Sequence, residues 1–353
     1  MTAVDRNRFL DYAKGSLIFL VTWGHIIQWT GYSDDGYWSD AVFKLIYMFH
    51  MPLFMAIGGY LAFRSINRDS VATTFAKRFN GLVVPIFAWA VPFHLVLWTA
   101  TRDAPVGAAG LLQAFIGGVV HDLWFLWALF SASVAFAVLR HLRCDKPIYG
   151  LAMVLLMLAV PGPALLKYVL PYFAIGYFLA KHEDRLRFLY RPVLIGSVGF
   201  VASGVCYAMW DERTYVYVSK MALTGDNGFV VLFRYVASAI VGVTALALMY
   251  LLYHVTPQRD LVRLGQGSLY VYILQIYFFI VLTAVWDGTH ALNGSLWYSL
   301  AFAPMTAMVF SFGFLELGVT ANRFPRLARV FFGRPTDRRR DSVPADIAID
   351  ARA

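Results

Sequence analysis

Long runs of apolar residues, separated by short polar stretches, recur along almost the whole chain. A helix needs about 20 mainly apolar residues to cross a bilayer core about 30 Å thick. We therefore predict an all-α fold, a polytopic integral membrane bundle of about ten transmembrane helices. The predicted spans cover residues 13–30, 41–63, 80–100, 123–140, 147–160, 165–180, 193–210, 229–253, 268–287 and 296–320.

Lysine and arginine are distributed unevenly between the two sides of these spans. Most of the 30 lie in the N-terminal segment, in every second loop and in the tail from Arg323. The opposite loops hold only Arg102, Arg213 and Lys220. The positive-inside rule then places both termini in the cytoplasm. The net charge of +9 is explained by this topology, and no nucleic-acid-binding motif accompanies it.

The composition excludes an ordinary soluble globular protein, because 59% of the residues are hydrophobic and only 14% are charged. We predict one transmembrane domain over residues 1–332. A basic tail at 333–353 has little apolar surface to bury and is expected to be disordered. The two cysteines, Cys144 and Cys206, provide neither a disulfide framework nor a cysteine-based metal site. No metal site is predicted.

The first span carries a lysine at its mouth and a histidine inside it. Lys14 and His25 are eleven residues apart, almost three whole helical turns, so both project from one face about 16 Å apart. Asp11 and Thr22 lie close to the same line. Histidine near mid-membrane can act as a general base or as a transient acyl carrier. Lysine at the cytoplasmic mouth suits the phosphates of a soluble donor. The alternative is an ordinary helix with a snorkelling lysine and a hydrogen-bonded histidine.

Other polar groups interrupt or border the apolar runs, and each has a structural alternative. A histidine in span two precedes a proline and a Gly-Gly pair, a basic pair precedes span three, a His-Asp pair and a tryptophan begin span four, and a glutamine lies in span nine. The histidine of span two could belong to a kinked and tightly packed helix, and the basic pair could anchor a helix. The residues that begin span four could form an interfacial aromatic belt, and the glutamine could make an interhelical hydrogen bond. The residues are His50, Lys77, Arg78, His121, Asp122, Trp124 and Gln275.

Six segments together resemble the acyltransferase family 3 membrane proteins, in the order in which that family has them. The segments are LDYAKGSLIFLVTWGH (10–25), FHMPLFMAIGGYL (49–61), KRFNGLVVP (77–85), LWFLWAL (123–129), YFAIGYFLAK (172–181) and LGQGSLYVYILQ (264–275). Each motif alone is weak, but the ordered set covers most of the chain and is specific.

The resemblance implies an integral membrane enzyme that transfers an acyl group, commonly acetyl, from cytoplasmic acyl-coenzyme A to a hydroxyl of a glycan. Acetyl-coenzyme A would be a co-substrate, with no permanently bound cofactor. His25 matches the family's essential histidine and Lys14 its basic partner. Arg78 falls in the basic segment associated with coenzyme A, where Asn80 and Gly81 occupy the area in which members usually have a further arginine.

The resemblance also implies a multi-pass protein of a bacterial inner membrane, which contacts lipid and can form a homo-oligomer. Members often have histidine where this chain has Gln275. In this interpretation Lys14, Lys77 and Arg78 hold the donor. His50, His121, Asp122 and Trp124 line the acceptor path, and Gln275 is a further substrate-site residue. A secondary transporter that uses His25 and Lys14 as a proton relay is the main alternative, and a non-catalytic scaffold is a weaker one. Few carboxylates lie deep within the predicted spans and no internal repeat is visible, and both observations argue against a transporter.

Overall fold

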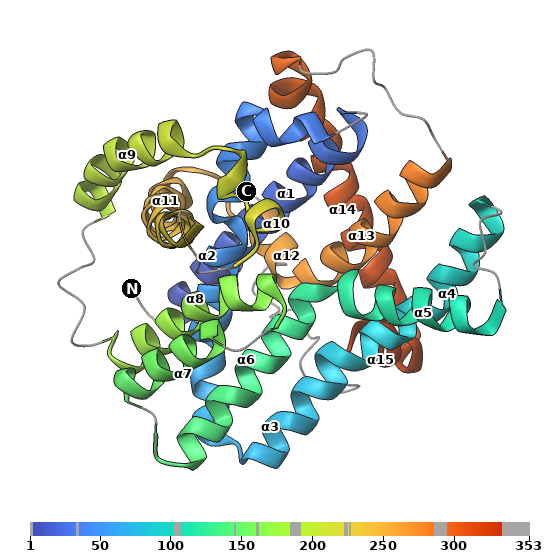
Figure 1. Ribbon diagram of the computed structural model, residues 1–353, viewed down its shortest axis with the longest axis horizontal. Coiled ribbons are helices and arrows are strands. Elements are labelled where there is room, and N and C mark those ends of the chain that lie inside the picture. The colour runs from blue at the N-terminus through green and yellow to red at the C-terminus, as the bar shows by residue number, and fades with distance from the viewer. Residues whose placement is uncertain are drawn as a thin grey trace, which may run out of the picture.

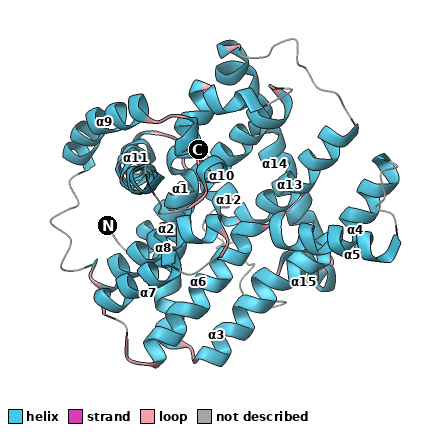
Figure 2. Ribbon diagram, in the orientation of Figure 1, coloured by secondary structure: helices cyan, strands magenta, loops and turns pink. Residues whose placement is uncertain are grey.

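A computed structural model describes residues 3–32, 35–101, 107–144, 146–159, 162–183, 192–221, 225, 227–285 and 295–333. Within these ranges the chain forms helices joined by turns and loops, and no strand (Figure 2). The predicted all-α class is confirmed. Of the predicted tail, only Gly333 is described, and residues 334–353 lie outside the described part.

Each of the ten predicted spans is helical over most of its length. Between the third and fourth predicted spans the chain forms a further helix, α5. The α-helices are α1 (Ala3–Thr30), α2 (Ala41–Arg68), α3 (Val71–Arg78), α4 (Val84–Thr101), α5 (Gly107–His121), α6 (Trp124–His141), α7 (Pro147–Ala159), α8 (Ala164–Lys181), α9 (Pro192–Met209), α10 (Val216–Ser219), α11 (Asn227–Val255), α12 (Arg259–Gln266), α13 (Ser268–Val285), α14 (Ala303–Ala321) and α15 (Pro325–Phe332).

Five of the described helices are long and apolar enough to cross a membrane: α2, α6, α9, α11 and the helix Tyr298–Ala321, which includes α14. The pair α12 and α13, bent by 72°, would be a sixth. α1 is long, but its polar residues lower its hydropathy. Only 6% of the apolar α9 segment is buried within the protein, as expected of a helix that faces lipid. The structure therefore supports a multi-pass membrane protein.

Glycines allow the closest helix pairs to approach at backbone distance. α2 packs against α8 and α1 against α12 (Figure 1). A Cβ at Gly176 of α8 would overlap the carbonyl of Ala56, and one at Gly265 of α12 would overlap the carbonyl of Asp11. Membrane helices associate by such small-residue contacts because lipid provides no hydrophobic driving force between them. The contact with α12 holds the Lys14 end of α1 in place.

α1 lies between two clusters of buried apolar side chains. Ile18 and Val21 belong to a cluster formed with α6, α8 and α13. Leu17 and Ile26 belong to a second cluster, which includes side chains of α2 and α11. The first helix therefore runs through the middle of the packed core, and its polar side chains are held among neighbouring helices.

Candidate active site

The face of α1 that carries Lys14 borders an internal cavity. Lys14, Ile18 and Val21 line this space of about 190 Å³, and His25 follows one turn beyond Val21 on the same face. We call it the inner cavity. Its remaining walls are mainly apolar and come from α2, the π-helical turn Phe79–Val83, α6 and α13: Met51, Phe54, Ile57, Gly58, Leu61, Leu82, Phe125, Leu126, Leu129, Ser268, Leu269 and Tyr272. A narrow apolar passage with one cation at its end is well suited to a long chain that carries phosphates.

Lys14 forms an ion pair within its own helix, beside the inner cavity. Its ammonium lies 2.8 Å from the Asp11 carboxylate, and both side chains are about one-fifth exposed. Gln266 of α12 donates a hydrogen bond to the same carboxylate at 3.2 Å. The predicted alignment of Asp11 with Lys14 is confirmed, and the ammonium borders a partly open, largely apolar space.

His25 is packed against aromatic rings and keeps one ring nitrogen free. Its imidazole stacks on Trp29 with a centroid distance of 4.7 Å and meets Phe279 edge-on at 6.4 Å. Nδ1 is buried and has no hydrogen-bond partner among the described residues. A histidine with a structural role normally satisfies its ring nitrogens. The free nitrogen therefore favours a chemical role over the structural alternative.

Gln275 of α13 anchors α1 one turn before His25. The Thr22 hydroxyl lies 2.6 Å from Oε1 of Gln275, and both side chains are fully buried. Nε2 of Gln275 has no hydrogen-bond partner among the described residues. The expected interhelical hydrogen bond of Gln275 is confirmed. Its free amide group lies close to the histidine-bearing turn.

His50 lies at the level of His25 and faces a second, smaller cavity. It is eleven residues from Leu61 at the inner end of α2, just as His25 is eleven residues from Lys14 on the antiparallel α1. His50 Nδ1 lies 2.8 Å from the carbonyl of Ile46, which satisfies that nitrogen. The kinked, packed alternative for His50 is thus partly supported, because its Nδ1 is engaged.

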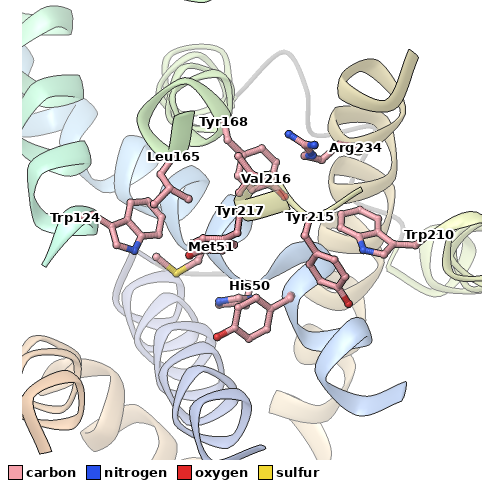
Figure 3. A pocket seen from close by; sticks show the side chains of 11 residues that line it. His50, Met51, Trp124, Leu165, Tyr168, Trp210, Tyr215, Val216, Tyr217 and Arg234 are labelled. Carbon is pink, nitrogen blue, oxygen red and sulfur yellow. The ribbon is translucent and has the colours of Figure 1, made fainter. Parts of the chain in front are cut away.

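The second space, which we call the outer cavity, is lined mainly by aromatic side chains. Figure 3 shows Trp124 on the left, His50 below and Arg234 at the upper right of this space. Its volume is about 20 Å³. Met51 lines both cavities and separates them. The full lining is Tyr47, His50, Met51, Trp124, Leu165, Tyr168, Trp210, Tyr215, Val216, Tyr217 and Arg234.

The two basic residues predicted to bind the donor, Lys77 and Arg78, contact different residues. Lys77 lies 2.8 Å from Asp69 and is just over half exposed, and it contributes with Arg68 to lowering the pKa of that carboxyl. Arg78 donates a hydrogen bond at 3.1 Å to Ser65, which is one turn beyond Leu61 on α2. Arg78 therefore lies next to the Leu61 end of the inner cavity, whereas Lys77 points to the surface loop.

The His121-Asp122 pair does not line either cavity. His121 is exposed, and Asp122 points toward His94 of α4, with Oδ2 3.7 Å from Nε2. A Cβ at Gly118 would overlap the His94 ring, so the glycine makes room for this pair. Burial raises the pKa of Asp122 to about 6. Of the sequence-predicted acceptor residues, only His50 and Trp124 are brought together.

Sequence reasoning missed Arg234 and His94. Each is a polar residue inside an apolar helix, α11 for Arg234 and α4 for His94. An ionisable residue within a membrane-spanning segment is by default a candidate functional residue. This signal was present in the sequence for Arg234, which lies inside the predicted span 229–253.

The helical membrane fold and the two cavities near His25 and His50 are compatible with a membrane-embedded enzyme. The chain matches the family model described as an acyltransferase domain over residues 7–314, and it therefore belongs to the acyltransferase 3 family. The resemblance seen in the sequence is confirmed, and the protein is an acyltransferase.

Two similar proteins extend over most of the chain. Nodulation protein NolL of Sinorhizobium fredii is 30% identical over 364 residues, which cover 96% of this chain and 95% of the relative. Nodulation protein NolL of Mesorhizobium japonicum is 28% identical over 291 residues, covering 77% of this chain and 76% of the relative. No solved structure matches the chain.

Proposed function

We propose that this acyltransferase moves an acyl group, most often acetyl, from cytoplasmic acyl-coenzyme A to a hydroxyl of a cell-surface or exported glycan. The observation that carries the proposal is the position of His25, with a free ring nitrogen, one turn beyond the inner cavity and level with His50 of the outer cavity. Donor and acceptor would approach this histidine from opposite sides.

The donor would enter through the inner cavity. Its phosphates would meet Lys14 and Arg78 at the cytoplasmic end, with Lys77 nearby at the surface. The pantetheine arm would extend along the apolar wall of α1 and α2, which covers about 15 Å from Leu61 to Met51 at the rise of an α-helix. Acyl-coenzyme A is a co-substrate in this scheme and not a resident cofactor.

His25 could act in either of two balanced mechanisms. As a general base, His25 takes the proton of the acceptor hydroxyl while the oxygen of that hydroxyl attacks the thioester carbon. The proton then passes from His25 to the departing thiolate. As an acyl carrier, His25 attacks the thioester itself, releases the thiol and hands the acyl group to the hydroxyl. In both routes the C–S bond breaks and an ester C–O bond forms. Gln275 would position α1 in either route.

The acceptor would reach His25 through the outer cavity, where His50 and Trp124 offer a polar group and an aromatic face. His121 and Asp122 lie to one side and would act only on parts of the acceptor outside this cavity. The remaining apolar helices complete the proposed ten spans, with both termini in the cytoplasm of a bacterium and the protein in its inner membrane. The uneven distribution of lysine and arginine, which are concentrated in every second loop and at both ends of the chain, supports this orientation.

The test compares surface glycans and lipids from cells that carry the intact protein, no protein or His25→Ala. We expect a mass increment of one acyl ester, removed by mild base, only with the intact protein. General acid–base groups contribute about 10²–10⁴-fold, so His25→Ala should abolish detectable product. His254→Ala, at an exposed histidine on α11, is the matched control. Identical glycan profiles in all cells would contradict the proposal and favour transport.

A further inference from the structure

Arg234 is a fully buried cation at the outer cavity. It lies on α11, with no exposed surface, and its guanidinium points toward the space that His50 and Trp124 line (Figure 3). Among the residues that the structure describes, no carboxylate forms an ion pair with it. An uncompensated buried charge is costly to a fold, so its retention requires other polar contacts.

The hydrogen bonds of the Arg234 guanidinium go to one short segment outside α11, and the guanidinium also lies 6.0 Å from the centroid of the Tyr168 ring of α8. Nε donates to the carbonyl of Thr214, Nη1 to the carbonyl of Lys220 at 2.7 Å, and Nη2 to the Ser219 hydroxyl. Nη1 also lies 3.1 Å from the sulfur of Met221. The planar fork of arginine suits such a set, because it presents several donors in fixed directions. Arg234 thus holds the segment Asp211–Met221 against α11.

The held segment forms one wall of the outer cavity. Tyr215, Val216 and Tyr217 line the space, next to Trp210 at the end of the preceding connection (Figure 3). The segment consists of a 3₁₀ turn (Glu212–Thr214) and the single turn α10. The other walls belong to the long helices α2, α6, α8 and α11. Of these walls, the short segment has the least regular structure to hold it.

The backbone of Lys220, at the end of the segment, has a strained conformation. Its backbone has φ 57° and ψ −145°, a conformation that is normally restricted to glycine. The same residue's carbonyl accepts the hydrogen bond from Arg234. The observed position of the segment therefore depends on contacts that offset this strain, and Arg234 supplies four of them.

The cavity is too small for its proposed substrate in this position. Its volume of about 20 Å³ is close to that needed for a single water molecule, far below that of a sugar ring. A wall must therefore move before a glycan hydroxyl can reach the level of His25. The segment Asp211–Met221 has the least regular secondary structure of the walls, and most of the hydrogen bonds that it receives from outside itself come from Arg234, so we take it as the wall that moves.

We propose that Asp211–Met221 is a cap over the acceptor site, that Arg234 fastens it, and that its side chains Tyr215 and Tyr217 select the acceptor sugar. This inference rests on the proposed glycan acyltransferase function and deepens it. Arg234 is a positioning residue in this scheme, because it acts through the cap and not on the reacting atoms. Aromatic faces presented by the cap would stack on the apolar faces of a sugar.

The test separates the acceptor side from the donor side. Purified protein is given acetyl-coenzyme A with a panel of p-nitrophenyl glycosides, and thioester cleavage is also measured without acceptor. We expect Arg234→Gln to raise the acceptor KM at least about tenfold while the KM for acetyl-coenzyme A stays unchanged. Ser219→Ala, which removes one contact without unpairing the cation, should raise the acceptor KM about threefold. Hydrogen exchange of residues 211–221 should be faster in both variants.

Arg213→Gln is the matched control, because Arg213 is 77% exposed and contacts only the exposed Asp211 within the described chain. Tyr217→Ala should change which glycosides are acylated. A wild-type protein that acylates neither the panel nor cellular glycans would overturn the proposed function. An active wild type with unchanged acceptor KM in both Arg234→Gln and Ser219→Ala, or with an equal rise in donor KM, would overturn the cap.

Discussion

The Thr22 hydroxyl of α1 lies 2.6 Å from the Gln275 amide oxygen of α13, three residues before His25 along the first helix. This buried contact joins two helices at the turn that presents the proposed catalytic imidazole. It gives Gln275 a positioning role that its place in the sequence alone does not reveal, because residues 22 and 275 are separated by most of the chain.

Gln275→Leu should lower kcat and leave the KM for acetyl-coenzyme A unchanged. The substitution keeps the side-chain volume but removes a neutral buried hydrogen bond, worth about 1 kcal/mol. If that contact is needed to hold His25 in position, kcat should fall about fivefold. Steady-state kinetics of the purified protein measure both constants. Thr22→Val should give the same pattern, and a rise in donor KM in either variant would argue against the positioning role.

Met51→Ala should increase thioester cleavage in the absence of acceptor. Met51 separates the two cavities, and its truncation would join them and give water access to the donor. The variant should also lose about 2–5 kcal/mol of stability, as buried methionines do on truncation to alanine. Release of free thiol from acetyl-coenzyme A measures the cleavage. Met209→Ala, on the exposed face of α9, should leave the rate at the wild-type level.

Gly176→Ala should destabilise the protein by about 2 kcal/mol. The new Cβ would overlap the backbone carbonyl of Ala56, so α2 and α8 must separate. Gly196→Ala in α9 is the control, since open space surrounds that position, and it should be neutral or slightly stabilising. Thermal unfolding in detergent compares the two. Equal transition temperatures would show that the helices do not pack at backbone distance.

Asp122 should make stability depend on pH. Burial raises its pKa to about 6, so the folded protein binds this proton more tightly than the unfolded chain does. Its contribution to stability is therefore full below the unfolded pKa near 4 and is lost as the pH rises through 6. Asp122→Asn should raise the unfolding temperature relative to wild type at pH 8, and this advantage should shrink toward pH 4.5. A constant difference across this range would contradict the raised pKa.

The helical segments were predictable because hydropathy directly reflects the cost of placing polar groups in lipid. The face shared by Lys14 and His25 was predictable for a similar reason, since helical spacing alone fixes it. The contacts between residues that are distant in the sequence were not predictable. The orientation of Asp122 depends on His94 and on the space left by Gly118, which are distant in the sequence or have no pattern of their own.

The role of the connection after α9 could not be predicted from the sequence either. Residues 211–221 look like an ordinary polar loop, and only the structure shows four contacts from Arg234 that hold them over a cavity. The bend of 72° between α12 and α13 likewise depends on how Gly15 and Gly265 bring α12 against α1. Such contacts follow from tertiary packing and not from local composition.

Met51 has one more consequence for a cell that uses this protein. A reaction that joins reagents from two aqueous compartments needs a route for the acyl group, yet an open route would let ions leak and discharge the electrochemical gradient. Met51 lines both cavities, so in the proposed function its thioether side chain would stand where the acyl group passes from donor to acceptor. In that scheme Met51 would keep solvent on the two sides apart, and the permeability barrier of the membrane would be preserved during catalysis.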